Sequence, residues 1–222
     1  AESWGHRLPD RQLAAAPIHS KEGEAYLDAM HAAGNYAFAN RSALTERLRR
    51  TMRKFSGGDA EINLIYDVSH NIAKIEDHHV HGVSCRCCVH RKGATRALGG
   101  DHSELASRFS GIGQPVLVPG DMGTASWVLA GPKSGSNDAF ASSCHGAGRR
   151  LSRKAARETI DGEQLIADLQ AKGIEVRART PRVIAEEAPD AYKNVDDVIR
   201  LTSQAGLARP VARLTPLTVI KG

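Results

Sequence analysis

The sequence predicts an α+β fold. Helical and strand patterns are mixed along its 222 residues without a regular βαβ alternation. Hydrophobic content of 41% and charged content of 25% lie in the ordinary globular range, and the length is sufficient for a substantial core. Because we find no internal repeat and no low-complexity linker, we expect residues 1–222 to contain no internal domain boundary.

The first quarter of the chain is predicted to be helical. Ser20 is a candidate N-cap for a helix over residues 21–41, where apolar side chains keep helical spacing. A second helix is expected over residues 42–55, with basic residues on its outer positions. Gly57 and Gly58 then end the helical pattern.

Strands are predicted in the middle of the chain. Residues 61–71 alternate in hydrophobicity and indicate a strand that ends near Asp67. Residues 83–92 alternate in the same way. Residues 114–132 read as two short buried strands joined by a turn that contains Pro119, Gly120 and Gly123.

The last third mixes both patterns. Leu165, Ile166 and Leu169 mark a helix closed by Gly173, and a strand follows over residues 174–179. A further helix is expected over residues 195–205 with Gly206 as its cap, and an extended tail over residues 211–222.

The bulk properties favour an anionic partner. A net charge of +5 and a pI near 9.2 are typical of proteins that bind nucleic acid or nucleotides, although proteins of other classes share them. No apolar run is long enough for a membrane span, and no signal pattern is present. Cys85, Cys87, Cys88 and Cys144 read as cytoplasmic thiols. The missing initiator Met suggests a fragment or a processed product.

One stretch combines several chemical groups. In "ASSCHGAGRRLSR", His145 stands between a cysteine and a Gly-Ala-Gly turn, with Arg149, Arg150 and Arg153 behind it. Glycines admit a ligand close to the backbone, arginines hold phosphate, and an imidazole can act as a nucleophile. From these residues alone, a structural or metal-binding histidine remains the alternative.

Three further stretches have polar or glycine-rich turns after apolar runs. "YDVSHNIAK" places His70 where it can bind a metal, or hydrogen-bond within a turn. "VHRKGATRA" sets Arg91, Lys92 and Arg96 around Gly93, as a phosphate loop or a solvated loop. "PGDMGTASW" lets a base or a phosphate approach the backbone.

A competing cluster is "HHVHGVSCRCCVH", whose histidines and cysteines are able to bind zinc. Structural zinc sites usually show paired Cys-x2-4-Cys motifs, whereas Cys-x-Cys-Cys on a strand points to both faces. A metal-binding protein centred on this cluster is therefore a third hypothesis.

Eight stretches follow one another in a recognisable order: DRQLAAAP, AMHAAGNYAFANR, YDVSHNIAKIEDH, VHRKGATRA, GQPVLVPGDMGTASWVLAG, SSCHGAGRRLSRKAA, EEAPDAYKNVDDVI and VIKG. Together they resemble the tRNA-splicing ligase RtcB family across nearly the whole chain. The resemblance implies an RtcB-like mixed sheet with surrounding helices. It also implies an RNA ligase that joins 3'-phosphate or 2',3'-cyclic phosphate ends to 5'-hydroxyl ends, in tRNA splicing or RNA repair.

The resemblance further implies GTP and Mn²⁺ as cofactors, with His145 as the nucleophile that becomes guanylylated and His70 as a metal ligand. The implied nucleotide contacts are Asn71, Ser126, Ala147, Gly148, Tyr192 and Lys221. The implied RNA or phosphate contacts are Lys92, Arg149 and Arg153. Implied partners are RNA ends such as tRNA halves, an upstream half of the ligase and an archease-type activator, in the cytoplasm and without a membrane.

Two departures from the family pattern bear on activity. Asp121 stands where many members carry a small hydroxyl residue. The family's other metal-ligand motifs lie upstream, and none occurs here. Because His70 alone cannot hold two manganese ions, we expect a C-terminal, nucleotide-binding and catalytic portion that is active only with its upstream half. The alternative is a non-catalytic nucleotide- or RNA-binding fragment.

Overall fold

The computed structural model describes residues 7–136 and 138–221, without the side chains of Arg11, Ile220 and Lys221. It divides into two compact units, Ala1–His90 and Arg91–Gly222. The boundary falls inside a continuous strand, where the sequence carries no linker composition that would mark it. Helices and small sheets are mixed, so the predicted α+β class is confirmed.

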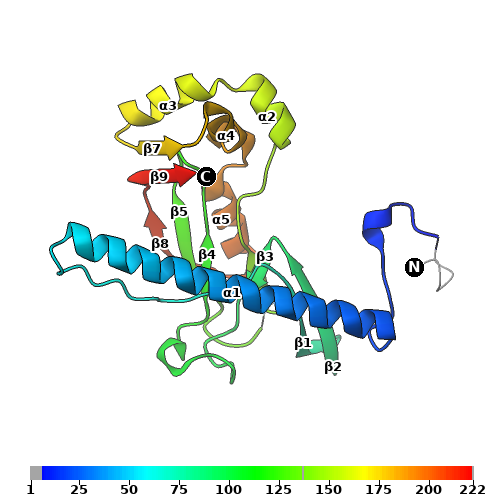
Figure 1. Ribbon diagram of the computed structural model, residues 1–222. Helices are drawn as coiled ribbons and strands as arrows, with labels where there is room; N and C mark the ends of the chain where they lie inside the picture. Colours follow the sequence, from blue (N-terminus) through cyan, green and yellow to red (C-terminus); the bar gives the residue numbers. More distant parts are fainter. Residues whose placement is uncertain (1–6, 137, 222) are drawn as a thin grey trace. The chain divides into compact units, whose positions relative to one another are not determined.

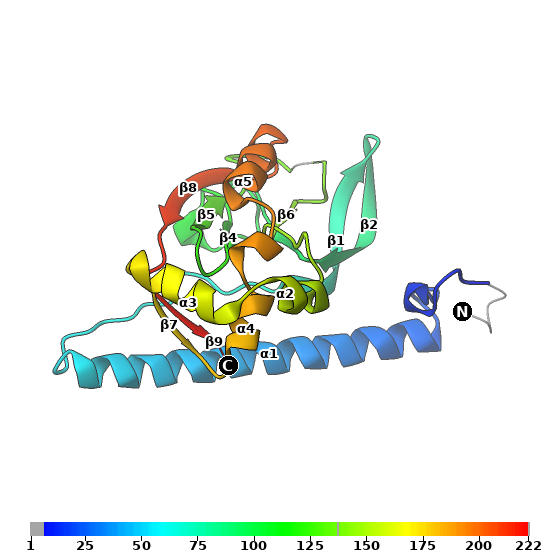
Figure 2. The same ribbon diagram turned by 90° about the horizontal axis from the view of Figure 1, so that it is seen from above.

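The first unit is built on one long helix, α1 (Lys21–Phe55), which follows the short 3-10 helix η2 (Arg11–Leu13) (Figure 1, Figure 2). Ser20 is its N-cap and accepts a hydrogen bond from the backbone N–H of Gly23 at 3.1 Å, as predicted. The prediction of two helices was wrong. No proline interrupts the pattern, and Thr45 Oγ1 donates to the carbonyl of Arg41 within a continuous helix.

The strand predicted from residue 61 to near Asp67 was also wrong. Despite its alternating pattern, this segment forms no strand in the described chain, and α1 supplies two of its contacts. Arg41 Nε lies 2.7 Å from Asp67 Oδ1, and Arg49 Nε donates to the carbonyl of Ile62 at 2.9 Å. A hairpin follows instead, formed by β1 (Asn71–Val80) and β2 (Val83–Lys92). His81 and Gly82 both have positive φ, as a two-residue hairpin turn requires.

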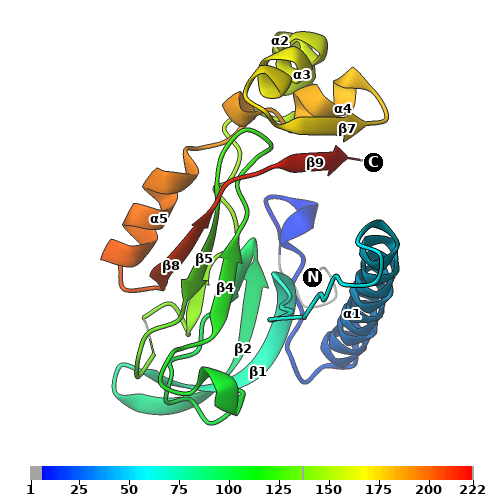
Figure 3. The same cartoon turned by 90° about the vertical axis from the view of Figure 1, so that its left-hand side faces the viewer.

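The second unit contains an antiparallel sheet in the order β4–β5–β8, with α5 (Val195–Gln204) packed along it (Figure 3). Its strands are β4 (Pro115–Val118), β5 (Ser126–Ala130) and β8 (Arg209–Leu214). The buried side chains of Val116, Leu129 and Ile199 lie in the core between the sheet and α5. The two strands predicted in residues 114–132 and the helix over residues 195–205 are thereby confirmed.

A second core lies between α3 (Gly162–Ala171), α4 (Pro181–Glu186) and a parallel pair of strands, β7 (Glu175–Ala178) and β9 (Thr218–Lys221). It buries Met122, Leu169, Ile174, Val176 and Ile184. The helix α2 (Arg153–Thr159) packs against α4. The remaining elements are β3 (Ala94–Arg96), which pairs with β6 (Ser142–Cys144), and the 3-10 helices η3 (Ser107–Phe109) and η4 (Pro189–Ala191). Among the described residues, no helix is long and apolar enough to cross a membrane.

Candidate functional site

His145 lies at the end of a short strand pair. β3 and β6 are antiparallel, with Ala94 opposite Cys144, so the chain before β3 runs beside the chain after β6. The backbone N–H of His145 donates to the carbonyl of Gly93 at 3.2 Å. The structure thus brings together two stretches that the sequence separates by about fifty residues, the Lys92–Gly93 loop and the histidine turn.

The His145 ring is partly buried, and its Nδ1 atom is closed to solvent. Ala147 is buried and belongs to the core of the β4–β5–β8 sheet, which anchors the turn. A Cβ placed on Gly146 would meet no atom within 4 Å, and Gly148 has a φ of +79°. The turn is anchored at Ala147, and the glycines on either side of it carry no side chain. A ligand can therefore lie against the backbone of this turn.

The chain after the turn is held by backbone bonds to residues 191–193. Arg149 and Tyr192 form an antiparallel bridge. Arg150 N donates to the carbonyl of Ala191 at 2.8 Å, and Lys193 N donates to the carbonyl of Gly148 at 2.9 Å. This pairing places Tyr192 next to the histidine segment.

Arg149, Tyr192 and Glu187 form a tight polar cluster. Arg149 Nη1 donates to the Tyr192 hydroxyl at 2.8 Å, and the guanidinium carbon lies 4.8 Å from the centre of the tyrosine ring. The Tyr192 hydroxyl donates to Glu187 Oε2. Burial, together with this hydrogen bond and the negative charge of Glu187, raises the pKa of Tyr192.

The donors of Arg149 are used within the protein. Its Nε donates to the carbonyl of Leu151 at 3.0 Å, Nη2 donates to the carbonyl of Glu186, and Nη1 lies 3.4 Å from Glu187. The arginine is therefore held in one place by four neighbours. In this structure it positions the tyrosine and the segment behind the turn.

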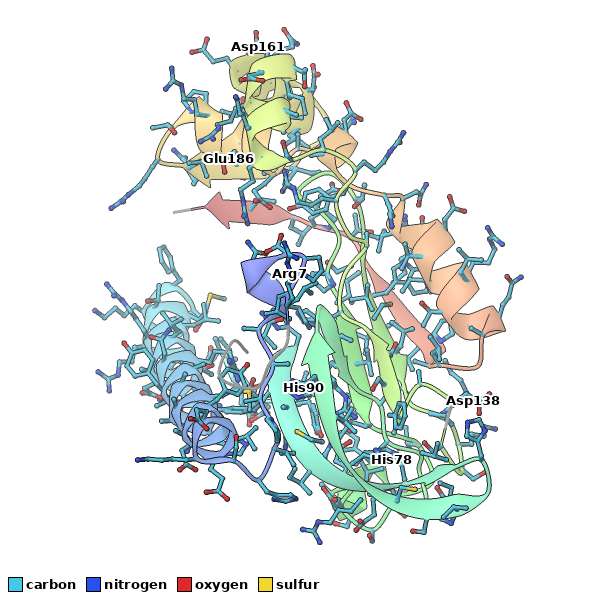
Figure 4. The ribbon with its side chains drawn as sticks, turned by 90° about the vertical axis from the view of Figure 1, so that its right-hand side faces the viewer. Arg7, His78, His90, Asp138, Asp161 and Glu186 are labelled. Atoms are coloured by element: carbon cyan, nitrogen blue, oxygen red, sulfur yellow. The ribbon has the colours of Figure 1, made fainter. Side chains whose placement is uncertain are left out.

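The neighbouring helix α2 contributes further arginines. Arg153 Nε lies 3.8 Å from Glu186 and 3.7 Å from Glu187, and its side chain remains 68% exposed. Arg157 Nη1 donates to Glu186 at 3.1 Å. Glu186 is the last residue of α4 (Figure 4). Two carboxylates thus face three arginines, which leaves the cluster with a net positive charge.

The glycine-rich turn before β5 packs against this region. Gly123 lies so close to Pro189, at the start of η4, that a Cβ would come within 2.8 Å of its ring. Ser126 Oγ accepts from the backbone N–H of Gly120 at 3.1 Å. Both carboxylate oxygens of Asp121 bond inside the turn, to the N–H of Gly123 and the hydroxyl of Thr124, each at 2.9 Å. Asp121 therefore stabilises the turn in which it lies.

The cations of the "VHRKGATRA" loop have different surroundings. Arg91 is 4% exposed, and its guanidinium donates to Ser142 Oγ at 2.9 Å and to the carbonyl of Phe140 at 2.8 Å. It fixes the segment in which Phe140 and Ala141 have positive φ, just before β6. Arg96 pairs with Glu104 at 2.7 Å. Lys92 is exposed and remains available to a ligand.

Three predicted residues fall elsewhere. His70 and Asn71 are exposed and lie at the start of β1, in the first unit. Lys221 ends β9, but its side chain lies outside the described residues. The remaining eight predicted residues belong to the second unit, and the contacts above join two of them directly, Arg149 and Tyr192.

The cysteine–histidine cluster occupies the β1–β2 hairpin. All four cysteines are free thiols. Cys88 Sγ lies 3.6 Å from His90 Nε2, and both line a cavity of about 560 Å³ in the first unit. His90 and His78 are seen on this hairpin in Figure 4. Across the described residues, no three side chains of His, Cys, Asp or Glu are grouped so that they could hold a metal ion.

A histidine beside an open glycine turn, with cations on both flanking segments, is an arrangement that can bind a phosphorylated ligand. Residues 1–222 match the family model described as tRNA-splicing ligase RtcB. The chain belongs to this family.

Named relatives support the assignment. The chain is 54% identical over 219 residues to the RNA-splicing ligase RtcB of Mycobacterium tuberculosis, covering 99% of this chain and 50% of that protein. It is 49% identical over 222 residues to the tRNA-splicing ligase RtcB of Thermococcus kodakarensis, covering 99% of this chain and 46% of that protein. The protein of the same name from Archaeoglobus fulgidus is 48% identical over 224 residues. The chain therefore spans about half the length of these relatives.

Sequence reasoning missed two residues of the site, Glu187 and Lys193. Both stand within "EEAPDAYKNVDDVI", from which only Tyr192 was selected. The available signal was that a carboxylate and an ammonium group lie close to that tyrosine in the sequence. Their role can be inferred only once it is known that residues 148–151 pair with this segment.

Proposed function

We propose that this chain is the nucleotide-binding and catalytic portion of a GTP-dependent RNA ligase. The reaction joins RNA 3'-phosphate or 2',3'-cyclic phosphate ends to 5'-hydroxyl ends through a histidine–GMP intermediate on His145. The observation that carries the proposal is the position of His145 between the Lys92–Gly93 loop and the open Gly146–Gly148 turn. The names of the relatives, RNA-splicing and tRNA-splicing ligase, support RNA as the substrate and tRNA halves as a natural class.

The geometry of His145 restricts which nitrogen reacts. Since Nδ1 is closed to solvent, we assign the attack on phosphorus to Nε2. Its attack on the α-phosphorus of GTP forms a P–N bond and releases pyrophosphate, and the imidazole loses its proton. The GMP group then passes to the RNA 3'-phosphate. Attack by the 5'-hydroxyl forms the phosphodiester and releases GMP.

Other residues of the site bind and orient. The open backbone of Gly146 and Gly148 fits the approach of a nucleotide, with Ala147 fixing the turn. Lys92 and Arg153, both exposed, offer positive charge to phosphates. Tyr192, held by Arg149 and Glu187, presents an aromatic surface at the same segment.

The described residues do not form a complete metal site. His70 is the proposed Mn²⁺ ligand, but no group of three suitable side chains surrounds it within the described part of the chain. We propose that the remaining ligands come from an upstream half of the ligase.

The test is to incubate the chain with Mn²⁺ and α-labelled GTP, alone and with the upstream half of a complete relative. We expect acid-labile, alkali-stable label on the protein after complementation, and its loss in His145→Ala. His102→Ala, which changes another histidine of the second unit, should keep the label. GTP binding without covalent label in both mixtures would instead favour the non-catalytic nucleotide- or RNA-binding fragment.

A further inference from the structure

Lys193 lies opposite Gly148 at the histidine turn. The Arg149–Tyr192 bridge sets residues 193 and 148 across from each other, and the Lys193 N–H donates to the Gly148 carbonyl at 2.9 Å. The Nζ atom lies 4.0 Å from the position that a Cβ on Gly148 would occupy. The ammonium group is therefore beside the bare backbone of the turn that follows His145.

The arginines of the neighbouring polar cluster lie close to acceptors within the protein. Arg149 contacts Tyr192, Glu187 and two carbonyls, and Arg153 lies near both Glu186 and Glu187. By contrast, Lys193 is exposed, and Nζ makes no hydrogen bond or ion pair with the residues that the structure describes. An unengaged ammonium group carries three donors and a full charge, the chemistry that a phosphate oxygen accepts.

Successive residues of an extended pair point to opposite sides. Tyr192 and Arg149 stack on one side, so the neighbouring Lys193 projects to the other. The glycine at position 148 keeps that side open, because any larger residue would place a side chain between Nζ and the turn. Its φ of +79° also makes glycine the residue that fits there without strain.

We propose that Lys193 is a phosphate-binding residue of this site, whose ammonium group donates to a phosphate of the nucleotide held at the Gly146–Gly148 turn. The identity of the ligand as a nucleotide rests on the proposed function. The position of the ammonium group beside the turn is independent of that proposal.

The side chain can be tested without disturbing the fold. The structural bond of residue 193 is made by its backbone N–H, which every residue except proline retains. Lys193→Met removes the charge and keeps an unbranched chain, whereas Lys193→Arg keeps the charge. Lys172→Met is the matched control, because Lys172 is also exposed but caps the end of α3.

The experiment titrates the full chain and each variant with inorganic triphosphate and with GTP by calorimetry, after thermal melting has shown equal stability. We expect Lys193→Met to weaken binding of both probes by about tenfold, the effect of losing one charge-assisted hydrogen bond. Lys193→Arg should stay within about threefold of the unchanged chain, and Lys172→Met should match it. A weaker dependence on salt should accompany the loss in Lys193→Met.

Two results would overturn the proposal: equal affinities for Lys193→Met and the unchanged chain, or no binding of triphosphate by the unchanged chain. Equal loss in Lys172→Met would also do so, because it would indicate a general effect of net charge. The covalent label on His145 reports separately on the proposed function. If His145 becomes labelled but Lys193→Met binds triphosphate normally, this inference alone is contradicted. If triphosphate binding depends on Lys193 but no label forms, the ligase proposal alone is contradicted.

Discussion

Tyr192 is the residue whose ionisation reports on the polar cluster behind the turn. Its pKa is raised above the ordinary value of 10.0, first by burial and then by the hydrogen bond to Glu187 and its charge. Because the folded pKa is raised, the stabilising contribution of the neutral phenol is complete below the ordinary pKa. It is lost as the pH rises through the folded value.

We predict that Glu187→Gln lowers the pKa of Tyr192 but leaves it above the ordinary value, since burial of the ring persists. The alkaline range over which stability falls should move to lower pH accordingly. A titration of tyrosinate absorbance measures this shift, and Tyr192→Phe identifies the transition among those of the four tyrosines. A curve for Glu187→Gln that superimposes on that of the unchanged protein would show that the Glu187 contact does not form in solution.

The sequence predicts candidate site residues but not the contacts that hold them. His145, Arg149 and Tyr192 are among these candidates, and the structure pairs the segments that carry Arg149 and Tyr192. Arg149 was expected to hold phosphate, yet its donors meet Leu151, Glu186, Glu187 and Tyr192. Which acceptor a guanidinium meets depends on segments about forty residues away, and no local pattern encodes that.

At the level of elements, β5 is the strand on which the second unit depends. It lies between β4 and β8, and its Leu129 is fully buried against the core shared with α5. On β4, Leu117 alternates to the other face and is 45% exposed. The same residue type on two faces of one sheet offers a direct comparison.

We predict that Leu129→Ala destabilises the second unit by about 3 kcal/mol, because it removes a buried side chain and leaves a cavity. Leu117→Ala should cost less than about 1 kcal/mol, because that side chain is already half exposed to water. Urea unfolding followed by tryptophan fluorescence is the measurement, as Trp127 lies on β5. Similar losses in the two variants would contradict the assignment of the buried face.

Helices with local capping signals and the paired strands β4 and β5 could be predicted, whereas one alternating segment was misleading. Ser20 caps α1 and Asn194 caps α5, and such side-chain bonds are readable from sequence. Residues 61–67 alternate like a strand, but they pair with no neighbouring strand of the described chain and therefore form none. The two predicted helices form the single helix α1 because no residue between them would end the first.

For the whole molecule, burial is distributed very unevenly. Within the described part of the first unit, the buried apolar side chains are Ala73 and Val89. The second unit contains two separate cores, with Leu129 and Leu169 among their fully buried members. Local opening requires little free energy where few apolar contacts are lost.

We therefore predict that trypsin removes α1 early and leaves a resistant fragment that begins between Lys74 and Lys92 and contains the second unit. α1 carries many Lys and Arg residues, and large apolar side chains such as Tyr36 and Phe55 remain 76% and 85% exposed on it. Hydrogen exchange should likewise be faster across α1 than in β4, β5 and β8. Leu129→Ala is the internal control, since loss of the second core should make the fragment itself susceptible. Equal protection of α1 and the β4–β5–β8 sheet would mean that the first unit is stabilised by contacts beyond its own sparse core.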